Sequence, residues 1–229
     1  MNHPDRRIFL KRLATLAGGV VLVPVVTSCS SGPSGGEEQA PAAPATTGPA
    51  LPEVPLVRPT EWDPIAYNRE RGNAGAIPPS YLPKINGPDG VTGHLGKHLP
   101  YVPEVDASLV PAGYVALMWG DPAKGYVRHP QAVRSEANNM EGHWYNWIRI
   151  RKAVDGEAEE LQSRYSDWPG TAEGDNGAYA VFGDGEITAD SGKNTIYLAA
   201  LPGDVQPGDT VRIHAHCLTH GEYVDFLTL

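Results

Sequence analysis

The fold is decided near the end of the chain, where Thr210–Cys217 (TVRIHAHC) runs through Leu218–Gly221 (LTHG) into Glu222–Leu229 (EYVDFLTL). Both outer segments are rich in β-branched and aromatic residues, and a glycine interrupts the chain between them. This pattern predicts two strands joined by a short turn. In the first strand, alternation places the apolar side chains and Cys217 on one face, so we expect Cys217 to point into a core.

The same stretch contains one of the two cysteines and three of the eight histidines of the chain. Cys217 and His220 stand three residues apart where the strand meets the turn, and a thiolate and an imidazole at this spacing can converge on one cation. By themselves, they also fit a buried unpaired cysteine beside surface histidines, because free cysteine is among the most buried residue types. His214 and His216 alternate onto the opposite face, where we expect them to be solvated.

Several segments before Thr210 also have the composition of strands. His143–Arg151 (HWYNWIRIR) is the clearest, and Tyr114–Trp119 and Thr195–Leu201 are similar. Strict alternation in the first of these places Tyr145 and Trp147 on one face. Short strands separated by glycine, proline and aspartate predict an all-β chain folded as an antiparallel β-sandwich.

Two segments are predicted to lie outside the strands. Glu61–Asp89 is broken at short intervals by glycine and proline, which predicts a loop that wraps the domain. Glu157–Ser163 is predicted to form one or two helical turns. Roughly 170 residues follow position 59, enough for one domain with a real core.

The chain begins with the features of an export signal. Two arginines at positions 6 and 7 precede the apolar run Leu13–Val26, and small residues lead to Cys29. The arginine pair indicates the twin-arginine route, and the apolar run is too short for a comfortable membrane span. The four residues ending at Cys29 resemble a bacterial lipobox, which implies cleavage before Cys29 and lipid attachment to it. An ordinary soluble signal followed by a chance cysteine is the alternative.

These features divide the chain into three parts. Residues 1–28 are predicted to be the signal peptide, and residues 29–59, rich in serine, glycine, alanine, proline and threonine, a flexible disordered tether. Residues 60–229 are predicted to form the β-sandwich. The expected location is the extracytoplasmic face of the bacterial cell envelope, with the membrane reached through the lipid on Cys29.

Charge and cysteine content narrow the function further. The formal net charge is −9, and removal of residues 1–28 changes it to −12. Such a chain is not expected to bind nucleic acid or to be held on anionic lipid by basic residues. An anionic substrate therefore needs a local positive site. With Cys29 joined to lipid, Cys217 has no partner for an intramolecular disulfide.

Four short segments then stand in a recognisable order: Gly96–Pro100 (GKHLP), His129–Pro130 (HP), Met140–Ile148 (MEGHWYNWI) and Cys217–Gly221 (CLTHG). In this order they resemble the superoxide reductases, the neelaredoxin and desulfoferrodoxin group, over about residues 60–229. The resemblance implies an immunoglobulin-like β-sandwich. It also implies one mononuclear non-haem iron per chain, with the ligands His98, His129, His143, Cys217 and His220.

The activity implied by the resemblance is the one-electron reduction of superoxide to hydrogen peroxide. An external donor, a rubredoxin-like or other small redox protein, would return the iron to the ferrous state. Lys97 is the candidate catalytic residue, since its ammonium group could attract superoxide to an otherwise acidic protein. The chain has no Cys-x-x-Cys pair, so no additional rubredoxin-like iron centre is expected.

The chain departs from the family pattern in two places. Gly96 stands where the family usually has a glutamate that can bind ferric iron. Residues 131–139 are inserted between His129 and His143, which are fourteen positions apart. If His129 is a metal ligand, the inserted residues must form a loop that leaves the position of His129 unchanged.

Two other classes of protein remain open at this point. A copper electron carrier also uses histidines and one cysteine on a β-sandwich, but commonly adds a methionine soon after the last histidine, and none follows His220. A non-catalytic surface lipoprotein that binds metal incidentally is the other. The sequence also leaves a homo-oligomer open.

Overall fold

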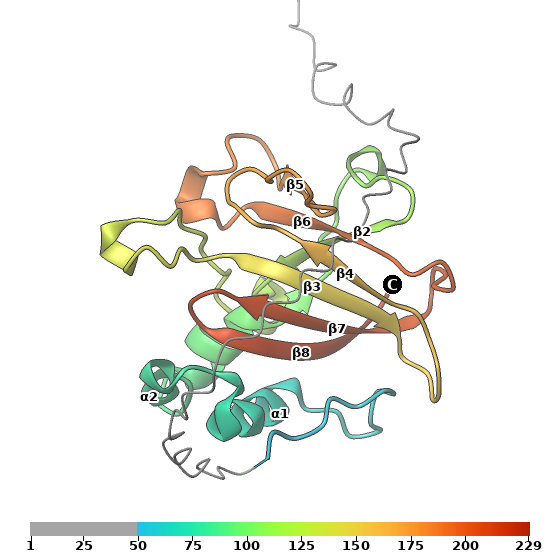
Figure 1. The fold of residues 1–229 in the computed structure, drawn as a ribbon, viewed down its shortest axis with the longest axis horizontal. Helices are drawn as coiled ribbons and strands as arrows, with labels where there is room; N and C mark the ends of the chain where they lie inside the picture. The colour runs from blue at the N-terminus through green and yellow to red at the C-terminus, as the bar shows by residue number, and fades with distance from the viewer. Residues whose placement is uncertain (1–49) are drawn as a thin grey trace, which may run out of the picture. The chain divides into compact units, whose positions relative to one another are not determined.

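In the computed structural model, residues 50–229 can be described, and their regular structure is mainly β (Figure 1). Two antiparallel sheets of four strands each make up the domain, consistent with the predicted β-sandwich. The first sheet has the order β1-β2-β6-β5, formed by Pro100–Tyr101 (β1), Tyr114–Trp119 (β2), Thr195–Ala200 (β6) and Ala178–Val181 (β5). The second has the order β4-β3-β7-β8, formed by Glu160–Arg164 (β4), Tyr145–Lys152 (β3), Thr210–Cys217 (β7) and Gly221–Thr228 (β8).

Helical segments are short and are concentrated before β1. The two α-helices are Pro64–Arg71 (α1) and Leu82–Ile85 (α2). The remaining helical turns are Gly72–Ala76, Pro79–Tyr81, Gly90–Leu95, Gly96–His98, Ala107–Leu109, Pro122–Lys124, Glu136–Asn138 and Ala189–Gly192. Among residues 50–229, no helix has both the length and the apolar character needed to cross a bilayer.

The main core lies between the two sheets and is rich in aromatic side chains. Trp119 from β2, Tyr145 from β3 and Tyr197 from β6 pack ring against ring, with Trp119 and Tyr145 stacked at a centroid distance of 4.1 Å. Cys217 belongs to the same core and is fully buried. The predicted inward orientation of Cys217 is therefore confirmed.

A β-bulge in β3 changes which residues face the core. Tyr145 pairs with Cys217 and Trp147 pairs with His216, so Asn146 is an extra residue in the ladder. Tyr145 is fully buried whereas Trp147 is half-buried. The predicted placement of both on one face is thus wrong, because a single extra residue reverses the alternation beyond it.

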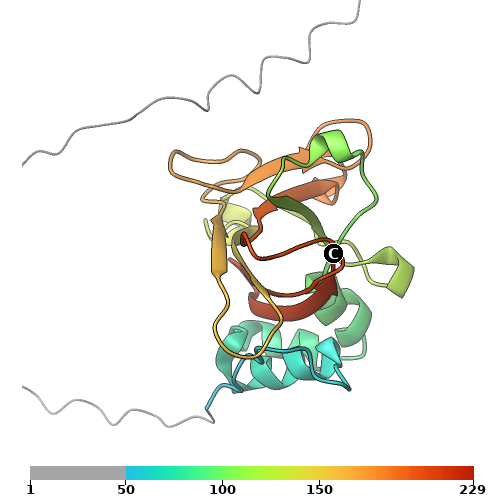
Figure 2. The same ribbon diagram turned by 90° about the vertical axis from the view of Figure 1, so that its right-hand side faces the viewer.

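The segment predicted as a loop over Glu61–Asp89 contains α1, α2 and several helical turns, so that prediction is wrong. Asp63 caps α1 by accepting hydrogen bonds from the backbone N–H groups of Ile65 and Ala66 at 2.9 and 3.0 Å. The helices lie alongside β8, at the edge of the second sheet (Figures 1 and 2). The glycine and proline residues of this segment favoured a loop prediction. The short helices are stabilised by packing against the domain rather than by helix propensity.

Asn68, in α1, hydrogen-bonds to the edge of β8 that, among the described residues, pairs with no other strand of the sheet. Its side-chain amide donates to the Val224 carbonyl at 2.7 Å and accepts from the Val224 N–H at 2.8 Å. One side chain thus reproduces the pair of hydrogen bonds that a neighbouring strand would make. The contact protects an edge that could otherwise pair with another chain.

The prediction of helical turns over Glu157–Ser163 is also wrong. Residues from Glu160 onward form β4, which pairs with β3 over Trp147–Arg151. Ser163, in β4, is fully buried, and its hydroxyl accepts a hydrogen bond from the Ala200 N–H at 2.8 Å. Long-range pairing has overridden the local preference of the segment.

Residues 50–59, assigned by composition to the tether, lie against the domain. Four of their backbone carbonyls accept hydrogen bonds at 2.8–3.3 Å from domain side chains: Arg71 to Pro52, Tyr67 to Glu53, Arg212 to Pro55 and Arg151 to Leu56. These contacts help to bury arginines on the outer face of the second sheet. The predicted signal peptide, Cys29 and the first part of the tether lie outside the described residues.

Candidate metal centre

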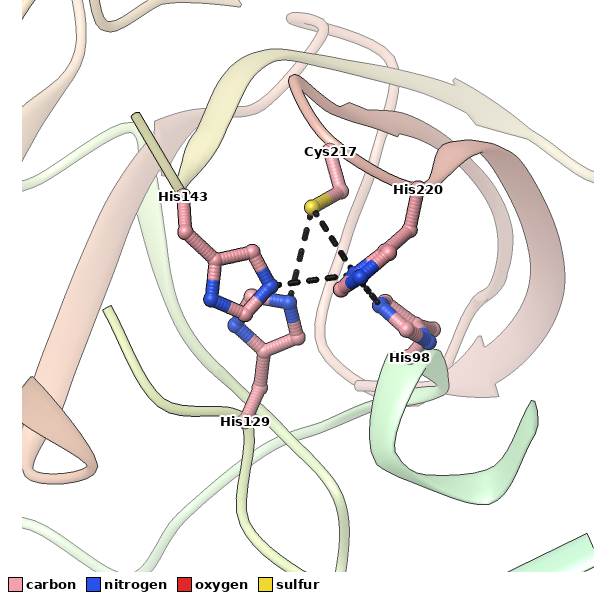
Figure 3. A group of neighbouring side chains, drawn as sticks. All are labelled: His98, His129, His143, Cys217 and His220. Atoms are coloured by element: carbon pink, nitrogen blue, oxygen red, sulfur yellow. Dashed lines mark hydrogen bonds between the residues drawn. The ribbon is translucent and has the colours of Figure 1, made fainter. Parts of the chain in front are cut away.

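The structure brings five side chains together at one end of the sandwich: His98, His129, His143, Cys217 and His220 (Figure 3). One nitrogen or sulfur atom from each lies within 4.8 Å of the corresponding atoms of the others. All are buried except His143, which is half-buried. The five residues singled out in the sequence therefore form a cluster with the composition of a metal site.

Four segments of the fold supply these side chains, and Cys217 and His220 belong to the same one. His98 ends the helical turn Gly96–His98, and His129 lies between β2 and β3. His143 precedes β3, Cys217 ends β7, and His220 is in the turn before β8. Because these segments are far apart in the sequence, the cluster exists only when both sheets have formed.

Residues 131–139, expected to be an insertion, form part of a loop that folds back on itself, and His129 lies in the cluster. Ala132 and His143 exchange two backbone hydrogen bonds of 2.9 Å, which close the loop between them. The His129 N–H donates to the Trp119 carbonyl at 3.1 Å, which fixes its backbone to the end of β2. The residues between Ala132 and His143 therefore form a loop whose two ends are joined by these hydrogen bonds.

Gly221 allows the turn that carries His220 to approach the segment before α2. Its φ of +82° is in the region that favours glycine, and an added Cβ would lie 2.2 Å from the Ala76 carbonyl oxygen. The His220 N–H donates to the Cys217 carbonyl at 3.2 Å across the same turn. Glycine at this position therefore permits the tight Cys-x-x-His arrangement.

Hydrogen bonding leaves imidazole lone pairs pointing into the centre of the cluster. His98 donates its Nδ1–H to the His94 carbonyl, so the neutral ring has an unprotonated Nε2. His220 Nδ1 lies 3.0 Å from His98 Nε2 and also 3.0 Å from His143 Nε2 (Figure 3). A single proton on His220 Nδ1 cannot form full hydrogen bonds to both His98 Nε2 and His143 Nε2. A cation between the three rings could instead accept a lone pair from each of these nitrogens.

The two short nitrogen–nitrogen distances would place those ligands at about right angles around an ion, whereas the longer sulfur–nitrogen distances would require wider angles. Two nitrogens 3.0 Å apart, as here, subtend about 90° at an ion about 2.1 Å from each, whereas tetrahedral angles would separate them by about 3.4 Å. Cys217 Sγ lies 3.6 Å from His129 Nε2 and 3.7 Å from His220 Nδ1. Five donors also exceed the four of a structural zinc site.

Burial determines the protonation of the cluster in the absence of metal. It lowers the pKa of His143 to about 3 and of His220 to about 2, and it places the pKa of His98 and His129 well below the usual range. The four imidazoles are therefore neutral near pH 7 and ready to bind a cation. Burial raises the pKa of the Cys217 thiol to about 12, so metal binding must release its proton.

Aromatic rings not singled out by the sequence patterns surround the histidines. Tyr81 stacks on His220 at a centroid distance of 3.8 Å, and Tyr223 stacks on His98 at 4.2 Å. The Tyr81 hydroxyl is also hydrogen-bonded to His94 Nδ1 at 2.8 Å. These rings fix the planes of two ligand candidates. Tyr81 lies in the segment predicted as a loop, so nothing in the local sequence pointed to it.

Lys97 lies beside the cluster. Its Nζ is 5.5 Å from the centroid of the Tyr81 ring, a cation–π contact that holds the ammonium next to the ring stacked on His220. The side chain is half-buried, and burial lowers the pKa of its ammonium group. The Lys97 ammonium thus lies next to a ring that stacks on one of the five cluster residues.

The absence of a side chain at Gly96 has a local explanation. A Cβ added at this position would lie 2.3 Å from Cδ1 of Tyr126, and two other ring atoms would be within 2.7 Å. The Tyr126 ring thus occupies the space that any side chain at position 96 would need. A larger residue requires this ring to move.

His214 and His216 lie on the face opposite Cys217, as expected, but His214 is not solvated. It is 8% exposed and hydrogen-bonded to Glu222 through Nε2 at 3.0 Å. His216 is half-buried, with Nδ1 2.6 Å from the Asn146 amide oxygen. The prediction of solvation is wrong for His214 because Glu222, itself paired with Arg71, covers it.

Comparison with known proteins identifies no relative. No family model, no curated protein and no solved structure matches the chain. The interpretation of the centre therefore depends on its own residues and their geometry.

The metal-free protein is expected to lose stability as the pH falls below about 6.5. The cluster histidines stay neutral in the fold but take up protons when unfolded, because their folded pKa values are lowered. Acid therefore favours the unfolded state, by about 5 kcal/mol per pH unit if all four respond. Urea unfolding of metal-free protein at pH 7.5 and 5.5 measures the effect. Equal midpoints at the two pH values would contradict the buried neutral cluster.

Proposed function

We propose that the chain is a superoxide reductase, converting one superoxide, one electron and two protons into one hydrogen peroxide. The observation that carries the proposal is the convergence of four imidazole nitrogens and one thiol sulfur within 4.8 Å. The residues involved are those implied by the family resemblance. An external small redox protein supplies the electron.

Iron is the metal that we propose for this centre. The resident ion would be held by His98, His129, His143, Cys217 and His220. When bound, iron supplies a ferrous–ferric couple that can pass one electron to superoxide. The single thiolate adds negative charge and a soft donor to four neutral imidazoles, a mixture suited to a redox-active transition metal.

The residues around the donors have separate roles in this proposal. Lys97 provides positive charge that attracts the superoxide anion to a protein with a formal charge of −9. Its ammonium can also donate hydrogen bonds to the peroxide product, directly or through water. Tyr81 holds Lys97 over its ring and keeps the plane of His220 fixed.

The location of methionines favours this proposal over a copper carrier. Met118 lies in a separate apolar cluster on the first sheet, and Met140 is 55% exposed in the segment before β3. Neither of these two described methionines is therefore packed among the five donors. A weak axial methionine of the kind common in blue-copper sites is thus not among the donors of the described cluster.

The proposal also includes the topology implied by the family resemblance, and the export signal and lipid anchor indicated by the N-terminal sequence. The two sheets are proposed to follow an immunoglobulin-like arrangement. Residues 1–28 are proposed to direct twin-arginine export, and lipid on Cys29 to anchor the protein at the cell envelope. Residues 50–59, at the end of the predicted tether, are hydrogen-bonded to the domain.

The replacement of Lys97 with alanine is expected to slow the reaction with superoxide about tenfold at low ionic strength, with iron content unchanged, because a steering charge is lost. Lys193→Ala is the matched control, since Lys193 pairs with Asp190 in a loop of the first sheet. The second-order rate constant is measured by rapid mixing across a range of salt concentrations. Equal rates for Lys97→Ala and the unchanged protein at low salt would refute the role of Lys97.

The reaction itself is tested by its stoichiometry. The ferrous protein is mixed with a known amount of superoxide, and hydrogen peroxide and dioxygen are measured together. The proposal predicts one peroxide per superoxide and no dioxygen from the reaction. Dioxygen released at half the amount of superoxide consumed would indicate dismutation, and no acceleration over the spontaneous reaction would indicate a non-catalytic metal-binding lipoprotein.

A further inference from the structure

A polar groove lies on the outer face of the second sheet, next to the candidate metal centre. It has a volume of about 390 Å³ and is lined from β3, β4 and the turn after β7. The lining residues are Arg134, Asn146, Trp147, Gln162, Arg164, Ser166 and Leu218. Two arginines and no carboxylate line this groove in a chain with a formal charge of −9.

Neither arginine is neutralised by a carboxylate. Within residues 50–229, the Arg164 guanidinium makes no hydrogen bond or salt bridge to another side chain or to the backbone. Arg134 is held in place by its Nη1, which donates to the carbonyls of Met140 and Glu141 at 3.1 Å each. Its guanidinium also lies 5.0 Å from the Trp144 ring. Within the described residues, the Arg164 guanidinium is thus unpaired and the Arg134 guanidinium is held in place by two carbonyls. Both retain N–H groups that donate no hydrogen bond within residues 50–229.

The two amide side chains present donors to the same groove. The Asn146 oxygen is engaged by His216 Nδ1 at 2.6 Å, and the Gln162 oxygen accepts from Arg149 Nε at 2.8 Å. Each amide therefore has its NH₂ group left for another partner. Ser166 donates its hydroxyl to Asp175, whose carboxylate also accepts from two backbone N–H groups. The Asp175 carboxylate is thus already hydrogen-bonded.

A surface made of guanidinium and amide N–H groups complements oxygen acceptors that carry negative charge. We propose that this groove is a binding site for a small oxyanion, a molecule that carries a phosphate or a carboxylate group. Its volume is within the range of small-molecule sites. The occupant would contact Leu218, the residue that follows Cys217, so binding would occur beside the metal centre without using any of its donors.

Calorimetric titration of the purified chain with inorganic phosphate, and separately with citrate, tests the proposal at constant ionic strength and without added metal. We expect saturable binding of at least one probe at one site per chain. The stronger of the two probes identifies a phosphate or a carboxylate as the preferred group. Arg164→Gln and Arg134→Gln should each weaken binding about tenfold or more, because each removes charge-assisted hydrogen bonds.

Arg58→Gln is the matched control, since it removes the same charge from an exposed position of the segment before α1. It should leave the affinity unchanged. The proposal is overturned if neither probe binds saturably, or if Arg58→Gln weakens binding as much as Arg164→Gln does. That second result would show binding to net charge rather than to the groove. Because the titration needs no metal, its outcome is independent of the proposed iron chemistry.

Discussion

Replacement of Cys217 with serine is expected to abolish the sulfur-to-iron absorption band of the oxidised protein and its rapid reaction with superoxide. The thiol is fully buried, with its sulfur 3.6–3.7 Å from two imidazole nitrogens. A serine hydroxyl has nearly the same shape but cannot provide a soft anionic donor at neutral pH. The effect should therefore be on the metal chemistry rather than on packing.

Visible absorption, iron content and circular dichroism of the two proteins measure this result. The serine variant should keep the β-sheet dichroism of the unchanged protein while losing the band. Retention of the band, with iron still bound, would show that Cys217 does not ligate the metal. The alternative of a buried unpaired cysteine would then be preferred.

Replacement of His143 with alanine is expected to weaken metal binding by more than about 100-fold. Loss of a residue that only hydrogen-bonds to a metal ligand typically lowers metal affinity about 10- to 100-fold, and His143 is proposed as a direct ligand. It is the one half-buried member of the cluster, so its removal is the least disruptive to folding. Titration of metal-free protein with Co²⁺ under anaerobic conditions measures the affinity through the absorption of the bound ion.

His216→Ala is the control for this experiment. His216 is also a half-buried histidine and pairs with Trp147 across β3 and β7, but it faces away from Cys217. Its replacement should leave the Co²⁺ affinity close to that of the unchanged protein. Equal losses in both variants would mean that the two histidines matter only for the stability of the sheet.

Most strands could be predicted because their signal is local. Tyr114–Trp119 and Thr210–Cys217 have the bounds expected from composition, and β8 follows Cys217 after a short turn. The order of the short histidine and cysteine motifs was enough to select the five residues that the structure brings together. The sequence could not show that their donor atoms converge, since this depends on the packing of both sheets.

The features that escaped prediction depend on contacts between distant segments. The bulge at Asn146 is an irregularity in pairing with β7, and α1 lies along β8 through hydrogen bonds from Asn68. The stacking of Tyr81 on His220 joins positions 139 residues apart. Arg134 and Arg164 likewise meet at one groove only in the folded chain. No periodicity in the sequence encodes such contacts.

X-ray absorption at the iron edge, on protein containing one iron per chain, tests the central claim most directly because it counts the atoms bound to the metal. The structure supplies four histidine nitrogens and one cysteine sulfur. The account therefore predicts one sulfur and about four nitrogen neighbours, with the sulfur lost in Cys217→Ser. An iron spectrum without a sulfur neighbour, or a purified protein that binds no iron, would contradict it.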